Sequence, residues 1–143
     1  MYPIQTPSGY VPQYAVSFAG MDGAAIVVDG GHGLPVATVL AAATSTPLGG
    51  STANASTMVG PFTPQLGRAI WLTLSGTWAG TVQLLRSHDG GTTKLPLTWP
   101  DGSSRASFNA NMNAAVSEET VFAATYYLSV TLSAGTLTYR LEQ

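Results

Sequence analysis

Residues 125–142 read Thr-Tyr-Tyr-Leu-Ser-Val-Thr-Leu-Ser-Ala-Gly-Thr-Leu-Thr-Tyr-Arg-Leu-Glu, the clearest strand pattern in the chain. Large apolar residues at every second position indicate β-strands, because successive side chains of a strand point to opposite faces of the sheet. The small residues Ser133-Ala134-Gly135 divide the stretch and favour a turn. We therefore expect a hairpin whose strands share a buried face, formed by Tyr126, Leu128, Val130 and Leu132 in the first strand and by Leu137, Tyr139 and Leu141 in the second.

The same alternation recurs upstream, beginning at Phe62. Ile70, Leu72 and Leu74 share one face of a predicted strand, and residues 81–87 alternate in the same way. Strands that recur about every 8–12 residues are typical of a β-sandwich or barrel. We expect an all-β fold, a jelly-roll or Greek-key β-sandwich over residues 61–143, with shorter strands at Lys94–Trp99, Arg105–Phe108 and Ala114–Glu118.

The first 60 residues have a different character. Pro and Gly separate short apolar pieces at residues 14–18 and 25–28, which predicts an extended N-terminal arm with short strands over residues 1–40. Residues 41–57 are almost entirely Ala, Ser, Thr, Gly and Pro, with Leu48 as their only large apolar side chain. Such a segment buries too little surface to offset the entropy of ordering it. We predict a linker or long loop over residues 41–60.

The composition indicates a protein that contacts other proteins. A chain of 143 residues fits one domain of ordinary size. Only 8% of its residues are charged, against roughly 25% in typical soluble domains. A surface with so little charge does little to keep copies apart, so we expect much of it to meet another protein. A thinly charged secreted domain remains the alternative.

Several classes of function are not expected. The five Lys and Arg residues are scattered and the net charge is −2, so no basic stripe is available for nucleic acid. The absence of cysteine excludes thiolate zinc sites and disulfides. The start of the chain lacks the pattern of a secretory signal, and residues 34–43 fall far short of the ~20 needed to span a bilayer. We predict no nucleic acid, membrane, metal or cofactor.

No set of residues predicts catalysis. His32 lies in a glycine-rich turn, and His88 is followed by Asp89, but neighbours on an extended backbone point apart. A catalytic histidine needs a nucleophile within reach and an orienting group. Glu118 and Glu119 point to opposite faces of a strand, whereas glycosidase carboxylates face one substrate. We therefore expect that the protein is not an enzyme.

The loop after residue 86 has a structural interpretation. Asp89-Gly90-Gly91 supplies the positive φ angles that tight hairpin turns require. The pattern Ser-x-Asp-x-Gly-x-Thr over residues 87–93 also resembles the Asp-box turn of sialidases and related β-proteins, which holds a hairpin together. Lys94 stands where that turn usually has Trp, and the resemblance implies no sialidase activity.

The aromatic residues allow two interpretations. Trp71, Trp78 and Trp99, with Tyr126 and Tyr127, could line a sugar-binding platform. Aromatic side chains of β-proteins more often fill the core, and we favour that interpretation.

A longer pattern resembles a module of tailed-phage and prophage structural proteins. Residues 76–91 match Gly-Thr-aromatic-x-Gly-Thr-Val-x-Leu-x-Arg-Ser-x-Asp-Gly-Gly, preceded by Phe-Thr-Pro-Gln-Leu-Gly-Arg at 62–68. The segment 124–141 continues the likeness, which covers roughly the C-terminal half. It implies a small virion component, and a short chain with one β-domain and a weakly charged arm resembles capsid decoration, or cement, proteins.

This resemblance implies partners and a location. The expected partners are the major capsid protein and copies of the chain itself, on the outer surface of the virion capsid after synthesis in the host cytoplasm. We expect the arm to lie along a neighbour and pair with its backbone; packing onto its own domain is the alternative. A receptor- or carbohydrate-binding module of a tail fibre or baseplate is the rival function. The expected arm anchors are Tyr2, Ile4, Tyr10, Val11, Tyr14 and Phe18.

Overall fold

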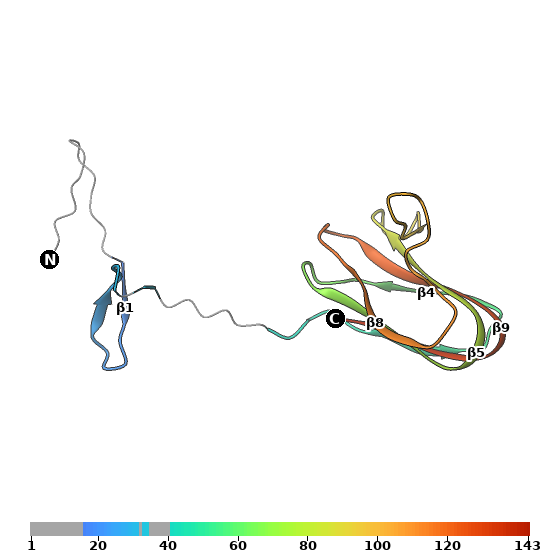
Figure 1. The fold of residues 1–143 in the computed structure, drawn as a ribbon, viewed down its shortest axis with the longest axis horizontal. Coiled ribbons are helices and arrows are strands. Elements are labelled where there is room, and N and C mark those ends of the chain that lie inside the picture. Colours follow the sequence, from blue (N-terminus) through green and yellow to red (C-terminus); the bar gives the residue numbers. More distant parts are fainter. Residues whose placement is uncertain (1–15, 32, 35–40) are drawn as a thin grey trace. The chain divides into compact units, whose positions relative to one another are not determined.

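The computed structural model describes residues 16–31, 33–34 and 41–143 (Figure 1). All regular elements among these residues are β-strands in antiparallel sheets, which confirms the predicted all-β class. The described residues include no helix that could cross a membrane. The chain divides into two compact units, Met1–Ala41 and Ala42–Gln143.

The first unit contains a small antiparallel hairpin. Its strands are β1 (Ser17–Ala19) and β2 (Ala25–Val27), with Phe18 opposite Ile26. The side chain of Asp22 accepts a hydrogen bond from the amide of Ala24 at 3.1 Å, which closes the turn. The short apolar pieces recognised in the sequence thus pair with each other.

The second unit is built on two long strands. They are β5 (Ala69–Ser87) and β9 (Thr125–Glu142), which pair with each other from Trp71 opposite Glu142 to Ser87 opposite Thr125. Both strands curve strongly near their middle (Figure 1). Shorter strands complete a seven-stranded sheet: β3 (Leu48–Thr52), β4 (Ser56–Phe62), β6 (Leu95–Pro96), β7 (Ser107–Phe108) and β8 (Met112–Glu118).

The bend divides the sheet into two halves. In one half, β3 pairs with the C-terminal part of β9 and β8 pairs with the N-terminal part of β5. In the other half, β4 pairs with the N-terminal part of β9, while β6 and β7 pair with the C-terminal part of β5. One hydrophobic core joins the two halves, with Ile70, Leu72, Leu74, Leu137 and Leu141 from the first and Phe62, Val82, Leu84, Tyr126, Leu128 and Val130 from the second.

The predicted hairpin over residues 125–142 is wrong, because β9 is one strand. Ala79 pairs with Ala134, but Gly80 pairs with Leu132, so Ser133 is an extra residue in β9. Such a β-bulge moves the following side chains to the other face. The buried positions therefore change from even numbers, ending at Leu132, to odd numbers, beginning at Leu137. A turn and a β-bulge can both change which positions are buried, so the sequence pattern alone does not distinguish them.

Two glycines permit the backbones to approach each other at this bend. Gly80 has φ 145°, and a Cβ there would lie 2.1 Å from the carbonyl oxygen of Thr131. Gly135 has φ 85°, and a Cβ there would lie 2.1 Å from the carbonyl oxygen of Thr77. Any side chain at either position would push the two long strands apart, so the curvature of the sheet depends on these residues.

The predicted linker over residues 41–60 is also corrected. It contains β3 and most of β4, and the second unit begins at Ala42 instead of residue 61. Small polar residues are sufficient here because both strands gain order from backbone pairing with β9. The side chain of Thr52 is buried, and Leu48 and Val59 pack against the core.

Candidate functional site

The candidate partner-binding surface is the β1–β2 hairpin, which contains one predicted arm anchor, Phe18. Its cross-strand neighbour is Ile26, and the amide of Val28 donates to the carbonyl of Val16 at 3.0 Å. Alternation along the strands places these four large apolar side chains on one face. The remaining predicted anchors lie outside the described residues: Tyr2, Ile4, Tyr10, Val11 and Tyr14.

The hairpin has little to hold it together by itself. Its strands have three residues each and form a separate two-stranded sheet. An isolated two-stranded hairpin is at best marginally stable in water. Val16 is 58% exposed and Val27, on the opposite face, is 53% exposed, while neither strand carries a charge. Covering the face that carries Val16, Phe18, Ile26 and Val28 would therefore stabilise the hairpin.

A buried ion pair lies where the chain leaves β8. The carboxylate of Glu119, which is 2% exposed, accepts hydrogen bonds from Arg86 Nε at 2.7 Å and Nη2 at 3.0 Å. The hydroxyl of Tyr126 donates to it at 3.1 Å. The amides of Thr120 and Val121 donate to its Oε1 at 3.0 and 2.8 Å. Five donors thus surround one carboxylate.

These contacts set the ionisation of the group. Burial acts to raise the pKa of Glu119, but the hydrogen bonds from Arg86, the Val121 amide and Tyr126 outweigh it and lower the pKa to about 2. The hydrogen bond to Glu119 raises the pKa of Arg86. Burial is the main reason why the pKa of Tyr126 is raised. A carboxylate with so low a pKa is a weak general base, and it is well suited to holding its loop in place.

The loop with the Asp-box resemblance joins β5 to β6, since Arg86 pairs with Leu95. The buried hydroxyl of Ser87 donates to Asp89 Oδ1 at 2.7 Å and accepts the amide of Gly91 at 2.9 Å. Asp89 accepts the amide of Thr93 at 2.9 Å, and this contact is the main reason why its pKa is lowered. The interpretation as a hairpin turn is confirmed.

Two details of this loop bear on the sequence predictions. Lys94 donates through Nζ to the carbonyl of Gly91 and lies 4.7 Å from the centre of the Tyr127 ring. His88 is exposed on the loop, while the carboxylate of Asp89 accepts hydrogen bonds from Ser87 and Thr93 within it. His32 lies outside the described residues.

The prediction that the aromatic residues fill the core holds only in part. Tyr126 and Tyr127 are buried, and Trp78 packs against the core. The prediction is wrong for Trp71 and Trp99, which are 45% and 53% exposed. Trp71 occupies an odd position of β5, where side chains point away from the core.

Trp99 lies beside a hollow of about 290 Å³ near the edge of β8. The guanidinium of Arg105 is 5.4 Å from the centre of its ring. Trp78 is placed differently, because its Nε1 donates to Asn111 Oδ1 at 2.7 Å. The ring of Trp99 is thus exposed and accessible for stacking, whereas the ring of Trp78 is partly buried.

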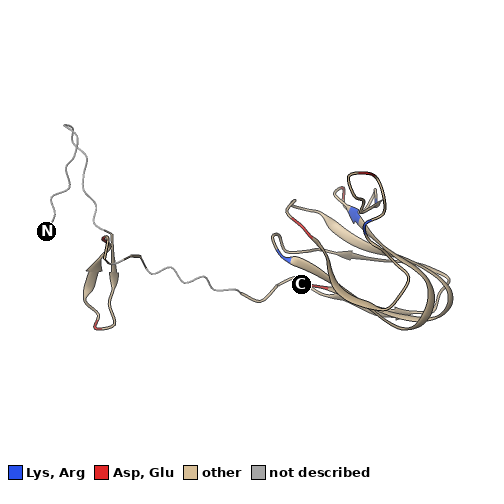
Figure 2. Cartoon of the chain, viewed as in Figure 1, with Lys and Arg blue, Asp and Glu red and all other residues tan. Residues whose placement is uncertain are grey.

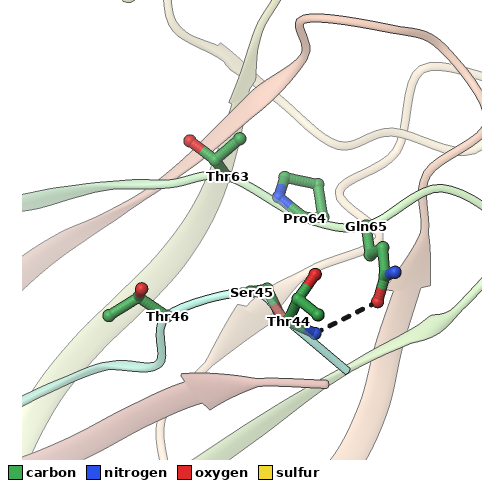
Figure 3. Close-up of a pocket in the computed structure, with 6 residues that line it drawn as sticks. All are labelled: Thr44, Ser45, Thr46, Thr63, Pro64 and Gln65. Carbon is green, nitrogen blue, oxygen red and sulfur yellow. Dashed lines mark hydrogen bonds between the residues drawn. The ribbon is translucent and has the colours of Figure 1, made fainter. Parts of the chain in front are cut away.

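A second hollow, of about 330 Å³, lies where the chain enters the second unit. The amide of Thr44 donates to Gln65 Oε1 at 3.3 Å across it (Figure 3). Its lining contains hydroxyl, amide and methyl groups and no charged residue: Thr44, Ser45, Thr46, Thr63, Pro64 and Gln65. This contact attaches residues 41–47 to the loop after β4.

Charged groups are sparse over the sheet, and its bent region carries none (Figure 2). In the described part of the chain, no three His, Cys, Asp or Glu side chains are grouped to hold a metal ion. Sequence reasoning did not single out Arg86, although it follows Val82 and Leu84 on the inward face of β5. A charge at an inward position requires a buried partner, and that signal predicts an acidic residue nearby.

Comparison of the chain with protein-family models, with curated proteins and with solved structures found no match in any of the three.

Proposed function

We propose that the chain is a non-enzymatic structural protein of a tailed-bacteriophage virion, a capsid decoration or cement protein. In this proposal it binds across major capsid subunits and stabilises the shell, with copies of itself alongside. The resemblance of residues 62–91 and 124–141 to phage structural proteins supports it, as does the low charge of the surface. We further propose that the bent sheet is a sandwich of jelly-roll or Greek-key type.

The observation that carries the proposal is the apolar face of the hairpin, on which Val16 is exposed and the other large side chains are only partly buried. Val16, Phe18, Ile26 and Val28 form one face on two short strands, which pair with each other and with no other strand of the described residues. A partner that covers this face removes apolar surface from water and also stabilises the hairpin itself. Attachment through such an element requires no cleft and no charge complementarity on the protein.

A single copy that binds its partner only through the β1–β2 hairpin has a low affinity. No other strand of residues 16–31, 33–34 and 41–143 pairs with the outer edges of β1 and β2, so these edges offer backbone groups to a strand of the partner, which adds hydrogen bonds to the apolar contact. Many copies on one particle, linked by contacts between neighbours, bind far more tightly than a single copy. A decoration protein of this kind does not need a large interface for each copy.

A receptor- or carbohydrate-binding module of a tail fibre or baseplate is the second candidate. The exposed ring of Trp99 beside the hollow at β8 favours it, because exposed aromatic rings stack on sugars. This candidate would use the second unit, and it predicts binding that does not depend on the hairpin.

Co-sedimentation with phage heads that lack the protein, and separately with host cell envelopes, tests the proposal. We expect saturable binding of the full chain to heads at a fixed copy ratio. Phe18→Ser should weaken this binding about tenfold or more, as expected for the loss of a central apolar anchor. Val27→Ser, which changes the opposite face, is the matched control and should bind like the unchanged chain.

The outcomes distinguish the candidates. Binding to envelopes alone would overturn the decoration role and support the receptor-binding module. Normal binding of Phe18→Ser to heads would keep the role but exclude the hairpin as the attachment site. Because the substitution lies outside the seven-stranded sheet, denaturation of that sheet should be unchanged and serves as the folding control.

A further inference from the structure

A second apolar surface lies on the loop between β8 and β9. Phe122 is 86% exposed, the most exposed large apolar side chain of the described second unit, and Val121 beside it is 52% exposed. Leu66, on the loop between β4 and β5, is 47% exposed. Both loops lie at the end of the sheet opposite its bend, where the chain also enters and ends (Figure 1).

These two loops border a groove of about 500 Å³. Its lining is almost wholly apolar, and none of its residues carries a charge. We call this groove, together with the projecting side chain of Phe122, the Phe122 surface; its residues are Thr63, Pro64, Gln65, Leu66, Val121, Phe122, Ala123 and Ala124.

The tip of the loop is held in its outward position. The side-chain carboxylate of Glu119 accepts hydrogen bonds from the amides of Thr120 and Val121. The backbone carbonyl of Glu119 accepts the amide of Gly67 at 2.8 Å, which ties the two loops together. Ala123 has φ 66°, a conformation unfavourable for a residue with a side chain. Strained backbone that persists beside a well-fixed frame is characteristic of functional sites.

We propose that the Phe122 surface is a contact between two copies of this chain. The side chain of Phe122 lines one side of the apolar groove and also projects from the surface. A two-fold axis through that surface lets each copy place its Phe122 in the groove of the other, which is the arrangement of an isologous interface. Because the surface is uncharged, the two identical copies oppose no like charges. This contact is independent of the hairpin and of the partner proposed for it.

The size of the surface sets the strength of the contact. An aromatic side chain contributes at most about 150–250 Å² of buried surface. Phe122, Val121 and Leu66 from two copies therefore bury less than the ~1,200–2,000 Å² of a typical stable complex. We expect weak, reversible association in dilute solution, which becomes complete where many copies are concentrated on one support.

Sedimentation equilibrium of the full chain over a wide range of concentration tests the contact. The unchanged chain should associate reversibly at the upper end of that range, and Phe122→Ser should raise the dissociation constant about tenfold or more. Met58→Ser removes another apolar side chain, 52% exposed on β4, and should associate like the unchanged chain. A chain that stays monomeric throughout, or association that Phe122→Ser leaves intact, would overturn the proposal.

Cross-linking identifies what occupies the groove. The chain has no cysteine, so Val121→Cys provides a single site for a benzophenone label. A mixture of isotope-labelled and unlabelled chains separates links between copies from links within one copy. Links between copies to residues 63–66 or 119–124 would support the proposal. Links to residues 1–41, or only within one copy, would show another occupant and overturn it.

Discussion

Replacing Glu119 by Gln tests whether the buried ion pair stabilises the protein through charge. Gln keeps the size of the side chain and one acceptor oxygen, but it cannot attract the guanidinium of Arg86. The pKa of Glu119 falls from 4.5 to about 2 in the folded protein. Each whole step in pKa is worth about 1.4 kcal/mol, so the ionised group contributes about 3 kcal/mol to the free energy of unfolding.

The sign of this contribution fixes its pH dependence. A carboxyl group whose pKa is lower in the folded state than in the unfolded state stabilises the fold above the unfolded value. The contribution of Glu119 is therefore complete above about pH 4.5 and is lost as the pH falls toward about 2. Glu119→Gln should be about 3 kcal/mol less stable than the unchanged chain at neutral pH, and the difference should shrink toward zero near pH 2.

Urea denaturation at several pH values, followed by the fluorescence of the three Trp residues, measures the difference. Urea is preferable to guanidinium chloride because added salt weakens ion pairs. Glu118→Gln changes the exposed neighbour on the opposite face and should alter the free energy of unfolding by less than about 0.5 kcal/mol. A deficit for Glu119→Gln that is the same at neutral pH and near pH 2 would refute the reasoning, because it would arise from packing instead of charge.

Two other predictions concern the backbone of the second unit. Gly80→Ala should lower the free energy of unfolding in urea by about 3 kcal/mol or more, because the new Cβ would meet the neighbouring strand. Gly102→Ala, at another positive φ but with open space around it, should cost only about 1 kcal/mol, and equal losses would exclude the steric explanation. Asp89→Ala should speed hydrogen exchange at the amide of Thr93, whereas Asp101→Ala should not; unchanged exchange in Asp89→Ala would show that this hydrogen bond does not hold the loop.

Period-two alternation was sufficient to predict which side chains are buried in the long strands. Ile70, Leu72, Leu74, Val82 and Leu84 are all 0–1% exposed, as the alternation predicts. Successive side chains of a strand point to opposite faces, and apolar residues are favoured at the positions that face the core. Burial of the strands in the second half of the chain was therefore predictable without knowledge of which strands pair.

The pairing of the strands was not predictable, because it depends on distant parts of the chain. The change of face between Leu132 and Leu137 fits a turn as well as a bulge. Only the opposite strand distinguishes them, since Gly80 and Gly135 allow β5 and β9 to pass through the bend together. In the same way, residues 48–62 have little apolar content, and their order comes from hydrogen bonds to β9.

The buried carboxylate of Glu119 and the exposed side chain of Phe122 have one physical explanation. A buried ion pair is a costly means of stabilisation, because apolar side chains of similar volume often do as well. An apolar side chain, however, cannot accept the amides of Thr120 and Val121. Glu119 does so, and with Gly67 it sets the path of the backbone that carries Phe122 outward. The charge buried at Glu119 is thus explained by the apolar side chain exposed three residues later, on the surface through which we propose that two copies of the chain meet.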